Sequence, residues 1–430
     1  MRTAIVLGGY GLIGSALMRG LREAGFQVIG IGRSMASAMA SDPGATWLIR
    51  DISMITTAEW PGLLDGVDVV VNASGALQDG GRDRLEAIHV TAIERLVEAS
   101  ATLPLRIVQI SAAGANERAG TAFFRSKGRG DAIIQAGARD WVILRPVLVL
   151  APDAYGGTAL LRAAAAMPAV LPRVLPGAQV RTVDIRDVTG AVVMAARGEI
   201  PSGSVADLTE SQSHAFDDLT LSIRRWMGFG RPVLRPALPD LLLRAASWLA
   251  DGLGHLGWRS PLRSTALRGL RDGITGDSSA WRRITGRECG SLTQTLARMP
   301  AVRQDRLFAR AYLLLPLAIA TLSIFWLFSG LIALWDVPRA MAVLAGRLPG
   351  WLAWLLVVGG AIADIGVGLA ILWRRWTKAA ALAMMALSGS YLLGGALLAP
   401  ALWGDPLGPM LKVFPGVMLA MTVWLLMEDR

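Results

Sequence analysis

Residues 8–14, Gly-Gly-Tyr-Gly-Leu-Ile-Gly, have the spacing of a loop that binds a pyrophosphate. They follow a short apolar stretch and open a helix-forming one. In such a loop the first glycine, Gly8, permits the tight turn, Gly11 lets the backbone approach the phosphates, and Gly14 lets the helix lie close to the sheet. The phosphates then meet the positive N-terminus of the helix. The alternative is a purely structural turn. The other loop residues that we expect to contact the nucleotide are Tyr10, Leu12 and Ile13.

The end of the second expected strand, residues 27–32, bears on the choice of cofactor. No carboxylate follows it to hold the 2′-hydroxyl of an adenosine ribose; Arg33 and Ser34 stand there instead. A guanidinium at this place suits a 2′-phosphate, which favours NADP(H) over NAD(H). The alternative is an exposed arginine after a strand.

Alternating strand and helix patterns run through the first 200 residues. Helical stretches begin near Gly11, Leu85 and Lys127. This βαβ rhythm predicts an α/β Rossmann fold, with a mostly parallel sheet covered by helices on both faces. The strand candidates are residues 3–8, 27–32, 67–74, 106–111 and 141–146.

Several stretches in this order resemble the short-chain dehydrogenase/reductase (SDR) superfamily, in its atypical and extended branches, over about residues 1–300. They are GGYGLIG, RDIS, VNASG, QISAAGA, SKGRGD, LRPVLVL and VDIRDVTGAV. The later part is most similar to the branch that contains the accessory NADPH-binding subunit of respiratory complex I, which binds nucleotide without known turnover. The resemblance implies cofactor contacts from Asp51, Ile52, Ala73, Ser74, Gly75, Lys127 and Pro146.

The superfamily's mechanism implies a tyrosine as general acid, a lysine that holds the nicotinamide ribose and a serine that steadies the substrate oxygen. Ser111 and Lys127 match the serine and the lysine. The tyrosine position, four residues before the lysine, holds Phe123, which has no proton to give. Tyr155 could substitute for it from the substrate lobe, although an ordinary surface or buried tyrosine is the simpler explanation. We therefore expect nucleotide binding but no ordinary carbonyl reduction.

The C-terminal third is apolar enough to enter a membrane. The whole chain is 53% hydrophobic, and most of that excess follows residue 310. Four stretches exceed the length needed to cross about 30 Å of hydrocarbon, so we predict a four-helix transmembrane bundle. Only Asp364 places a formal charge deep inside a span, and no lysine or arginine lies at a matching depth, so Ser388, Ser390 or Tyr391 are its expected neighbours. The four stretches are residues 311–335, 348–373, 379–404 and 406–427.

This region, over about residues 310–428, resembles the DoxX-like membrane family, which implies redox work at the level of quinones. Basic residues before the first span and in the second loop predict that both termini and the Rossmann domain are cytoplasmic, on a cell (inner) membrane. The domain limits that we predict are 1–215 for the nucleotide-binding domain, 216–302 for a small substrate lobe, and 303–430 for the DoxX-like domain.

Charge and composition limit the partners. Residues 222–302 carry 13 arginines against 5 acidic residues, which suits anionic lipid head groups. An arginine-rich solvated surface is the alternative. No nucleic-acid motif accompanies the charge, and one cysteine with three scattered histidines predicts no metal site. Residues 238–258 form either an interfacial helix or a helix packed on the substrate lobe.

Two functions fit these observations. The first is an oxidoreductase that passes a hydride from NADPH to a membrane-embedded acceptor, a quinone or a lipid-like molecule. The second is a non-catalytic nucleotide sensor, or a scaffold in a membrane redox complex, whose cofactor is structural. A homo-oligomer is compatible with either.

Overall fold

The computed structural model describes residues 2–80, 84–258 and 260–427. The chain divides into two compact units, which are described separately here. The domain limits predicted at residues 215 and 302 remain a prediction. The first unit comprises Met1–Asp251 and Ser260–Arg306, and the second comprises Gly252–Arg259 and Leu307–Arg430.

A seven-stranded sheet forms the centre of the first unit, in the order β10-β6-β5-β4-β1-β2-β3. Every neighbouring pair in it is parallel. The five predicted strands are confirmed, and β3 and β10 extend the sheet at its two edges. The strand bounds are β1 Thr3–Leu7, β2 Gln27–Gly32, β3 Thr46–Ile49, β4 Val69–Asn72, β5 Arg106–Ile110, β6 Trp141–Pro146 and β10 Ser204–Leu208.

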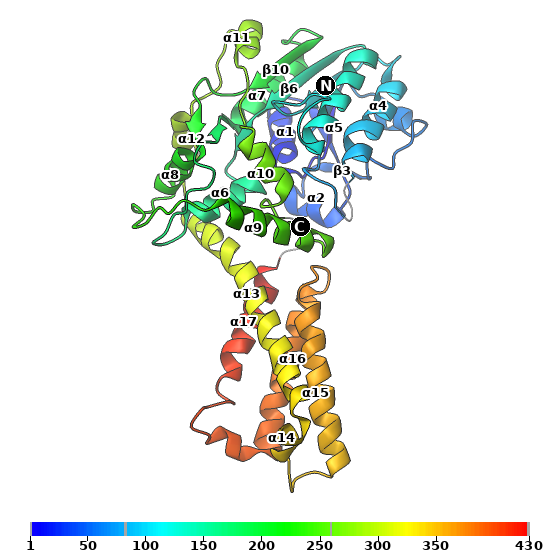
Figure 1. Cartoon of the computed structure of the whole chain (residues 1–430). Helices are drawn as coiled ribbons and strands as arrows, with labels where there is room; N and C mark the ends of the chain where they lie inside the picture. The colour runs from blue at the N-terminus through cyan, green and yellow to red at the C-terminus, as the bar shows by residue number, and fades with distance from the viewer. Residues whose placement is uncertain (1, 81–83, 259, 428–430) are drawn as a thin grey trace. The chain divides into compact units, whose positions relative to one another are not determined.

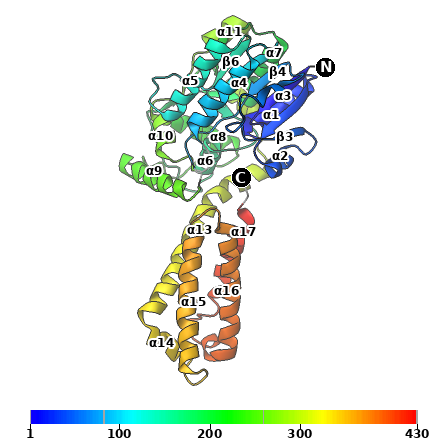
Figure 2. The same cartoon turned by 90° about the vertical axis from the view of Figure 1, so that its right-hand side faces the viewer.

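Side-chain alternation along the strands supplies both faces of the sheet with apolar residues. In β1, Ala4 and Val6 pack with α1 and α7, whereas Ile5 and Leu7 pack with α3, α4 and α5. Figure 2 shows α4 and α5 side by side on one face. The helix bounds are α1 Leu12–Glu23, α2 Met35–Ser41, α3 Trp60–Leu64, the π-helix η1 Ala87–Thr91, α4 Ala92–Ser100, α5 Ala122–Gly137 and α7 Ile185–Arg197.

The start of α5 corrects the sequence-based prediction. We expected this helix to begin near Lys127, but it begins at Ala122. The hydroxyl of Thr121 accepts a hydrogen bond from the backbone N–H of Phe124 at 3.3 Å and so caps the helix five residues earlier. Phe123 therefore lies in the first turn of the same helix that carries Lys127.

Short elements beside the sheet form the remainder of the first unit. Two small sheets pair β7 with β9 and β8 with β11, and α6 packs on α8. The bounds are α6 Gly157–Ala165, β7 Leu148–Leu150, β8 Gln179–Val180, β9 Thr182–Asp184, β11 His214–Ala215, α8 Phe216–Trp226, α9 Asp240–His255, α10 Ser264–Arg271, α11 Ser279–Thr285 and α12 Leu292–Arg298.

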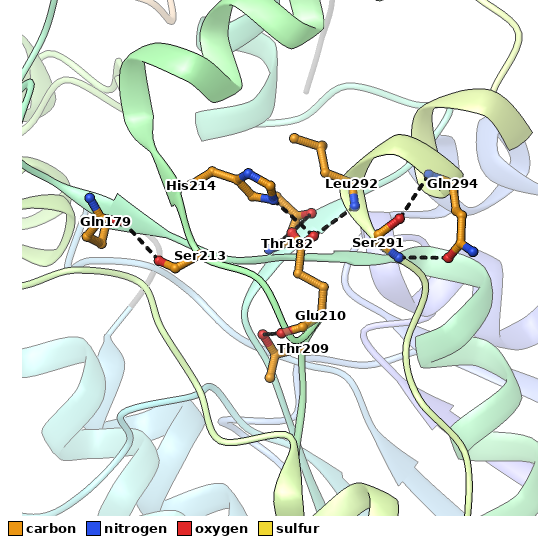
Figure 3. A network of polar contacts seen from close by, with 9 residues as sticks. All are labelled: Gln179, Thr182, Thr209, Glu210, Ser213, His214, Ser291, Leu292 and Gln294. Carbon is orange, nitrogen blue, oxygen red and sulfur yellow. Dashed lines mark hydrogen bonds and ion pairs between the residues drawn. The ribbon is translucent and has the colours of Figure 1, made fainter.

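One buried carboxylate, Glu210, joins several of these elements (Figure 3). It accepts hydrogen bonds from the backbone and the hydroxyl of Thr182, at 2.9 and 2.6 Å, and from the backbone N–H of Leu292 at 2.8 Å. Nε2 of His214 lies 3.0 Å from Oε2, the same carboxylate oxygen that accepts from Leu292. A buried carboxylate with this many partners is a structural cross-link between β9, β11 and α12.

The second unit contains the C-terminal helices, and α13, α15 and α16 run alongside one another (Figure 1). In the described part of the chain these three are the helices long and apolar enough to cross a membrane. The bounds are α13 Arg303–Trp335, α14 Val337–Ala342, α15 Gly350–Ala370, α16 Thr377–Leu398, the 3-10 helix η2 Pro400–Trp403 and α17 Val413–Leu426.

The fourth predicted span, residues 406–427, is shorter than expected. Its helix, α17, begins only at Val413 and has 14 residues, which extend over about 21 Å. Pro406, Gly408 and Pro409 precede it, and these residues disfavour a helix. As far as residue 427, where the description of the chain ends, the DoxX-like region therefore has three full-length apolar helices and one short one.

Candidate functional site

The glycine loop after β1 is built as the sequence predicts. Gly8 has φ +75°, a conformation that suits glycine, and a Cβ there would lie 2.9 Å from the Cα of Ser74. A Cβ on Gly14 would lie 2.1 Å from the carbonyl oxygen of Gly8. Gly11 precedes α1, and no side chain caps the helix. The first N–H groups of α1 are thus available to an anion, which fits a pyrophosphate.

The other end of this loop reaches the ends of β2 and β3. The hydroxyl of Tyr10 accepts a hydrogen bond from the backbone N–H of Arg33 at 3.2 Å, and its ring lies where a Cβ on Gly32 would stand. The Arg33 guanidinium is 3.8 Å from the Asp51 carboxylate, so two predicted ligands of opposite charge face each other. Ser34 caps α2 by accepting from the N–H of Ser37 at 3.2 Å.

Lys127 lies at the carboxyl ends of β4 and β5. Its ammonium donates to the carbonyl oxygens of Ser74 at 3.2 Å and of Ile110 at 3.0 Å, and the side chain is buried. Burial lowers the pKa of Lys127 to about 8, although the carboxylate of Asp131 opposes this shift. A Cβ on Gly75 would lie 3.4 Å from the same ammonium. The lysine is thus next to the loop predicted to contact the cofactor.

The hydroxyl of Ser111 is engaged by a partner that the sequence analysis missed. It donates to a carboxylate oxygen of Asp131 at 2.8 Å, and the Arg145 guanidinium donates twice to that oxygen, at 3.0 and 2.8 Å. Burial raises the pKa of Asp131, while Arg145 opposes that shift. Asp131 follows Lys127 by four residues, which places both on one helix face, and this spacing could have revealed it.

Phe123 stands where a reductase needs a phenol, and its ring lies between the phenyl ring of Phe124, at 5.2 Å, and the imidazole of His89. The centroids of the Phe123 and His89 rings are 5.8 Å apart with an edge-on geometry. The backbone N–H of Ala76 donates to Nε2 of His89 at 3.3 Å, so the ring proton is on Nδ1, which is 2.8 Å from the hydroxyl of Ser126. Burial lowers the pKa of His89 to about 2, with a further contribution from the Lys127 ammonium.

His89 is therefore a neutral imidazole whose single proton is directed at Ser126. That hydroxyl in turn donates to the carbonyl oxygen of Phe123 at 3.0 Å. The histidine lies in the π-helix η1, a rare element that occurs often at functional sites. Sequence analysis gave it no role, because η1 is not visible in a hydrophobic pattern. In its present tautomer it has no proton to give at Nε2.

Comparisons with known proteins agree with this geometry. A family described as NAD(P)H-binding matches residues 8–174, and a DoxX-like family matches residues 323–421. The chain joins an SDR-like, NAD(P)-binding domain to a DoxX-like domain. Among curated protein sequences the chain has no match.

Solved structures resemble the SDR-like part of the chain. A UDP-glucose 4-epimerase of Thermotoga maritima with UDP-glucose is 15% identical with a TM-score of 0.54, over 71% of this chain and 99% of that one. The Bordetella bronchiseptica enzyme WbmH with NAD+ is 18% identical, with a TM-score of 0.51 over 70% and 100%. An SDR superfamily protein from Agrobacterium tumefaciens with bound NAD is 17% identical, with a TM-score of 0.52 over 71% and 98%. At these identities the likeness shows the fold.

Three other predicted residues of the SDR-like domain have ordinary surroundings. Ile52 is buried in the apolar core. Pro146 ends β6, and its carbonyl oxygen accepts from the N–H of Ala113 at 3.1 Å. Tyr155 lies just before α6 and is 51% exposed. Among the hydrogen bonds of the described residues, none joins the phenol of Tyr155 to Ser111 or Lys127.

In the DoxX-like domain, Asp364 connects three helices. It lies in α15 and is 5% exposed; one carboxylate oxygen accepts from the phenol of Tyr391 in α16 at 2.6 Å. The other accepts from the hydroxyl of Ser329 in α13 at 3.1 Å. The indole of Trp326 stacks on Tyr391, with centroids 6.4 Å apart.

Of the three neighbours predicted for Asp364, the structure therefore confirms Tyr391. Ser390 donates instead to the carbonyl oxygen of Leu387. Ser329 was missed, because the sequence does not show which face of α13 meets α15. Both carboxylate oxygens have a hydroxyl partner, as a buried acid requires.

Proposed function

We propose that the chain is a membrane-anchored, NADP(H)-binding oxidoreductase whose acceptor is a quinone or a lipid-like molecule in the membrane. A bound nicotinamide supplies a hydride, and a quinone that takes it needs one further proton, from water, to become the hydroquinone. The observation that carries the proposal is a tight glycine loop with no side-chain cap at the start of α1, together with Phe123 at the place of the usual acid. An acceptor that draws its proton from water suits that combination.

The chain's own residues would hold the cofactor along the carboxyl edge of the sheet. The N–H groups at the start of α1 bind the pyrophosphate, and Gly8 and Gly11 allow its close approach. Arg33 binds the 2′-phosphate, for which it must give up part of its interaction with Asp51. Lys127 donates to the nicotinamide ribose, and the adjacent Ala73, Ser74 and Gly75 line the cofactor.

Carbonyl reduction is the chemistry that this site supports least. A carbonyl oxygen that receives a hydride becomes negative and needs an immediate proton donor. Phe123 has none, the Ser111 proton is directed at Asp131, and His89 is neutral with Nε2 unprotonated. A quinone that takes a hydride becomes the anion of a hydroquinone. This anion can leave the site and take its proton from water.

We propose a proton-handling or quinone-contacting role for Asp364. An ionised carboxylate at the centre of a span costs at least about 2.5–3.5 kcal/mol, so such a residue needs a reason to be there. The alternative role is a packing hydrogen bond between helices. Asp364→Asn keeps hydrogen-bonding capacity but carries no proton, whereas Asp364→Leu loses both.

These two variants separate the roles. If Asp364 handles a proton, the Asn variant keeps its thermal stability and loses quinone-linked NADPH oxidation. If the aspartate only packs, the Asn variant keeps both, and the Leu variant loses stability. If stability and activity are unchanged in both variants, Asp364 has neither role. The Ser388→Ala variant is the control, because Ser388 is a polar side chain that is buried as Asp364 is but lies in α16.

We further propose that α13, α15, α16 and the shorter α17 each cross a cell (inner) membrane, so that four crossings leave both termini and the SDR-like domain in the cytoplasm. Arg303, Arg306 and Arg310 precede or begin the first span, and Arg374 and Arg375 lie between the second and third. Short loops rich in basic residues stay on the cytoplasmic side. Reporter fusions at residue 345 and at the C-terminus test this topology, and equal cytoplasmic signals from both would contradict it.

The proposed activity is tested on the full chain in mild detergent. Any nucleotide that copurifies is identified, and NADPH oxidation is followed without oxygen, with and without a soluble quinone. The proposal predicts rapid oxidation that requires the quinone and is lost in Lys127→Met. Tight NADPH binding with no oxidation by quinones of different ring and tail would refute the oxidoreductase.

A second candidate is a nucleotide sensor or scaffold of a membrane redox complex. The observation that favours it is that Ser111, Lys127 and His89 are each hydrogen-bonded to other protein groups. In that case the cofactor copurifies, resists oxidation by quinones, and stabilises the chain against heat. Binding that is tight but inert would thus support the sensor and remove the oxidoreductase.

A further inference from the structure

Helix α9, Asp240–His255, has an apolar face that no other part of the described chain covers. Its inward face carries Leu243, Ser247 and Ala250, all buried. The outward side exposes large apolar side chains to 56–81% of their area. They are Leu241 at 76%, Leu242 at 56%, Trp248 at 81% and Leu249 at 66%.

These four side chains form one continuous stripe along the helix. They occupy positions i, i+1, i+7 and i+8, and at 100° per residue they fall within a sector of about 120°. The exposed Ala245 at i+4 lies between them. Just before the helix, Val233 and Leu234 are also 79% and 59% exposed. An apolar surface of this continuity marks an interaction site.

We propose that this stripe, Leu241, Leu242, Trp248 and Leu249, lies in the head-group region of a lipid bilayer that contains anionic lipids. An in-plane helix of this kind presents leucine and tryptophan to the acyl chains and basic residues to the head groups. The proposal rests on the membrane location of the DoxX-like domain and not on whether the cofactor turns over.

The end of α9 supplies the first argument for a lipid partner. Gly252–Arg259 belongs to the same compact unit as the apolar helices. The indole of Trp258 donates to the carbonyl oxygen of Leu372 at 2.7 Å, and the N–H of Arg374 donates to the carbonyl oxygen of Leu256 at 3.1 Å. Leu372 and Arg374 lie just beyond the end of α15, where the span is expected to leave the hydrocarbon. The segment that directly follows α9 is thus attached at the end of α15, where we place the head groups.

Charge supplies the second argument. Arg244 is exposed at the border of the stripe, and α10 exposes Arg268 and Arg271 nearby in sequence. Residues 222–302 contain 13 arginines and 5 acidic residues. Each basic residue held near an anionic surface adds to the attraction, whereas a protein partner would not need this excess.

Site-directed spin labelling tests the proposal on the full chain. The native cysteine, Cys289, is buried at 8% exposure and its burial raises the thiol pKa to about 12, so new cysteines are labelled selectively. Leu249→Cys and, independently, Leu241→Cys place a nitroxide in the stripe. Met54→Cys is the matched control, because Met54 is an equally exposed apolar side chain, at 73%, outside it.

The labelled chains are reconstituted in vesicles of phosphatidylcholine with phosphatidylglycerol. We expect both stripe labels to be at least several-fold more accessible to oxygen than to a water-soluble nickel complex, and the Met54 label to show the reverse. Replacing phosphatidylglycerol by phosphatidylcholine is expected to shift the stripe labels toward nickel accessibility.

Two results would overturn the proposal. Stripe labels as open to the nickel complex as the Met54 label would show a face in water. Labels shielded from both reagents would show a face covered by protein, and dipolar broadening between labels would identify that protein as a second copy. Only stripe labels that are more accessible to oxygen than to the nickel complex support a lipid partner.

Discussion

The two ends of the predicted cofactor site differ in what they retain. At the phosphate end, every glycine of the loop has the close contacts that the fold requires, and the start of α1 has no side-chain cap. At the nicotinamide end, Lys127 is present, but Phe123 replaces the acid and Asp131 engages Ser111. The comparison indicates that nucleotide binding and proton transfer can be lost separately. The loop before α1 is expected to supply the first, whereas side chains of α5 and of the end of β5 would supply the second.

The largest expected effect comes from the phosphate end. Gly14→Ala places a methyl group 2.1 Å from the carbonyl oxygen of Gly8, which displaces the loop from α1. We expect NADPH affinity to fall at least ~100-fold, or ~2.7 kcal/mol, by calorimetry. Gly190→Ala in α7 is the matched control, because nothing lies within 4 Å of its Cβ. Equal affinities in the two variants would show that the loop does not hold the cofactor.

The next effect concerns the choice between NADPH and NADH. Arg33→Ala removes the proposed partner of the 2′-phosphate and is expected to lower the preference for NADPH by about 1.5–3 kcal/mol, as for a lost charged hydrogen bond. Arg50→Ala removes an exposed arginine beside β3 and is the control. An unchanged ratio of the two affinities in Arg33→Ala would disprove the NADP(H) assignment.

The pH dependence of folding stability tests the surroundings of His89 at the nicotinamide end. The pKa of His89 is about 2 in the folded chain and about 6.5 in the unfolded one, so the unfolded state binds one more proton between these values. Stability from the neutral imidazole is complete above pH 6.5 and falls as the pH drops, by up to ~1.4 kcal/mol per pH unit.

His89→Gln should flatten this acid dependence by about one proton, measured as the slope of the free energy of unfolding between pH 6.5 and 4.5. His255→Gln, which changes an exposed histidine, is the matched control. A slope that is identical in all three chains would mean that His89 is protonated in the fold, and it would then become a candidate acid.

The smallest expected effect is a gain of carbonyl-reducing activity. The wild type is expected to reduce no simple aldehyde or ketone, whereas Phe123→Tyr restores a phenol four residues before Lys127 and should show a trace of such activity. Asp131 limits the gain, because it holds the Ser111 hydroxyl. Ketone turnover by the wild type would point to a substitute acid, with Tyr155 tested first by Tyr155→Phe.

Much of this comparison could be read from the sequence, for physical reasons. Apolar strands bounded by glycines predict the sheet, and the spacing of Gly8, Gly11 and Gly14 predicts a tight turn that leads into a closely packed helix. Local capping was harder, since Thr121 starts α5 before the apolar pattern does. Contacts across elements were hardest: the sequence places neither Arg145 against Asp131 nor Ser329 against Asp364, because both depend on how separate elements pack.

The membrane helices illustrate the same limit. Hydropathy predicted four spans of similar length, but a span also needs a continuous helix. Prolines and glycines before Val413 shorten the last one to 14 residues. The three long helices agree with the prediction, although α13 contains Pro316, because they remain continuous for 21 to 33 residues.

One measurement tests the central claim most directly: a single turnover of NADPH held by the wild-type chain, without oxygen, against a soluble quinone and against a simple ketone. If the phosphate end binds the nucleotide and the nicotinamide end lacks an acid, bound NADPH is oxidised after it is mixed with the quinone. It remains reduced after it is mixed with the ketone. Oxidation by the ketone at a comparable rate would contradict the account, because it would require an acid beside Phe123.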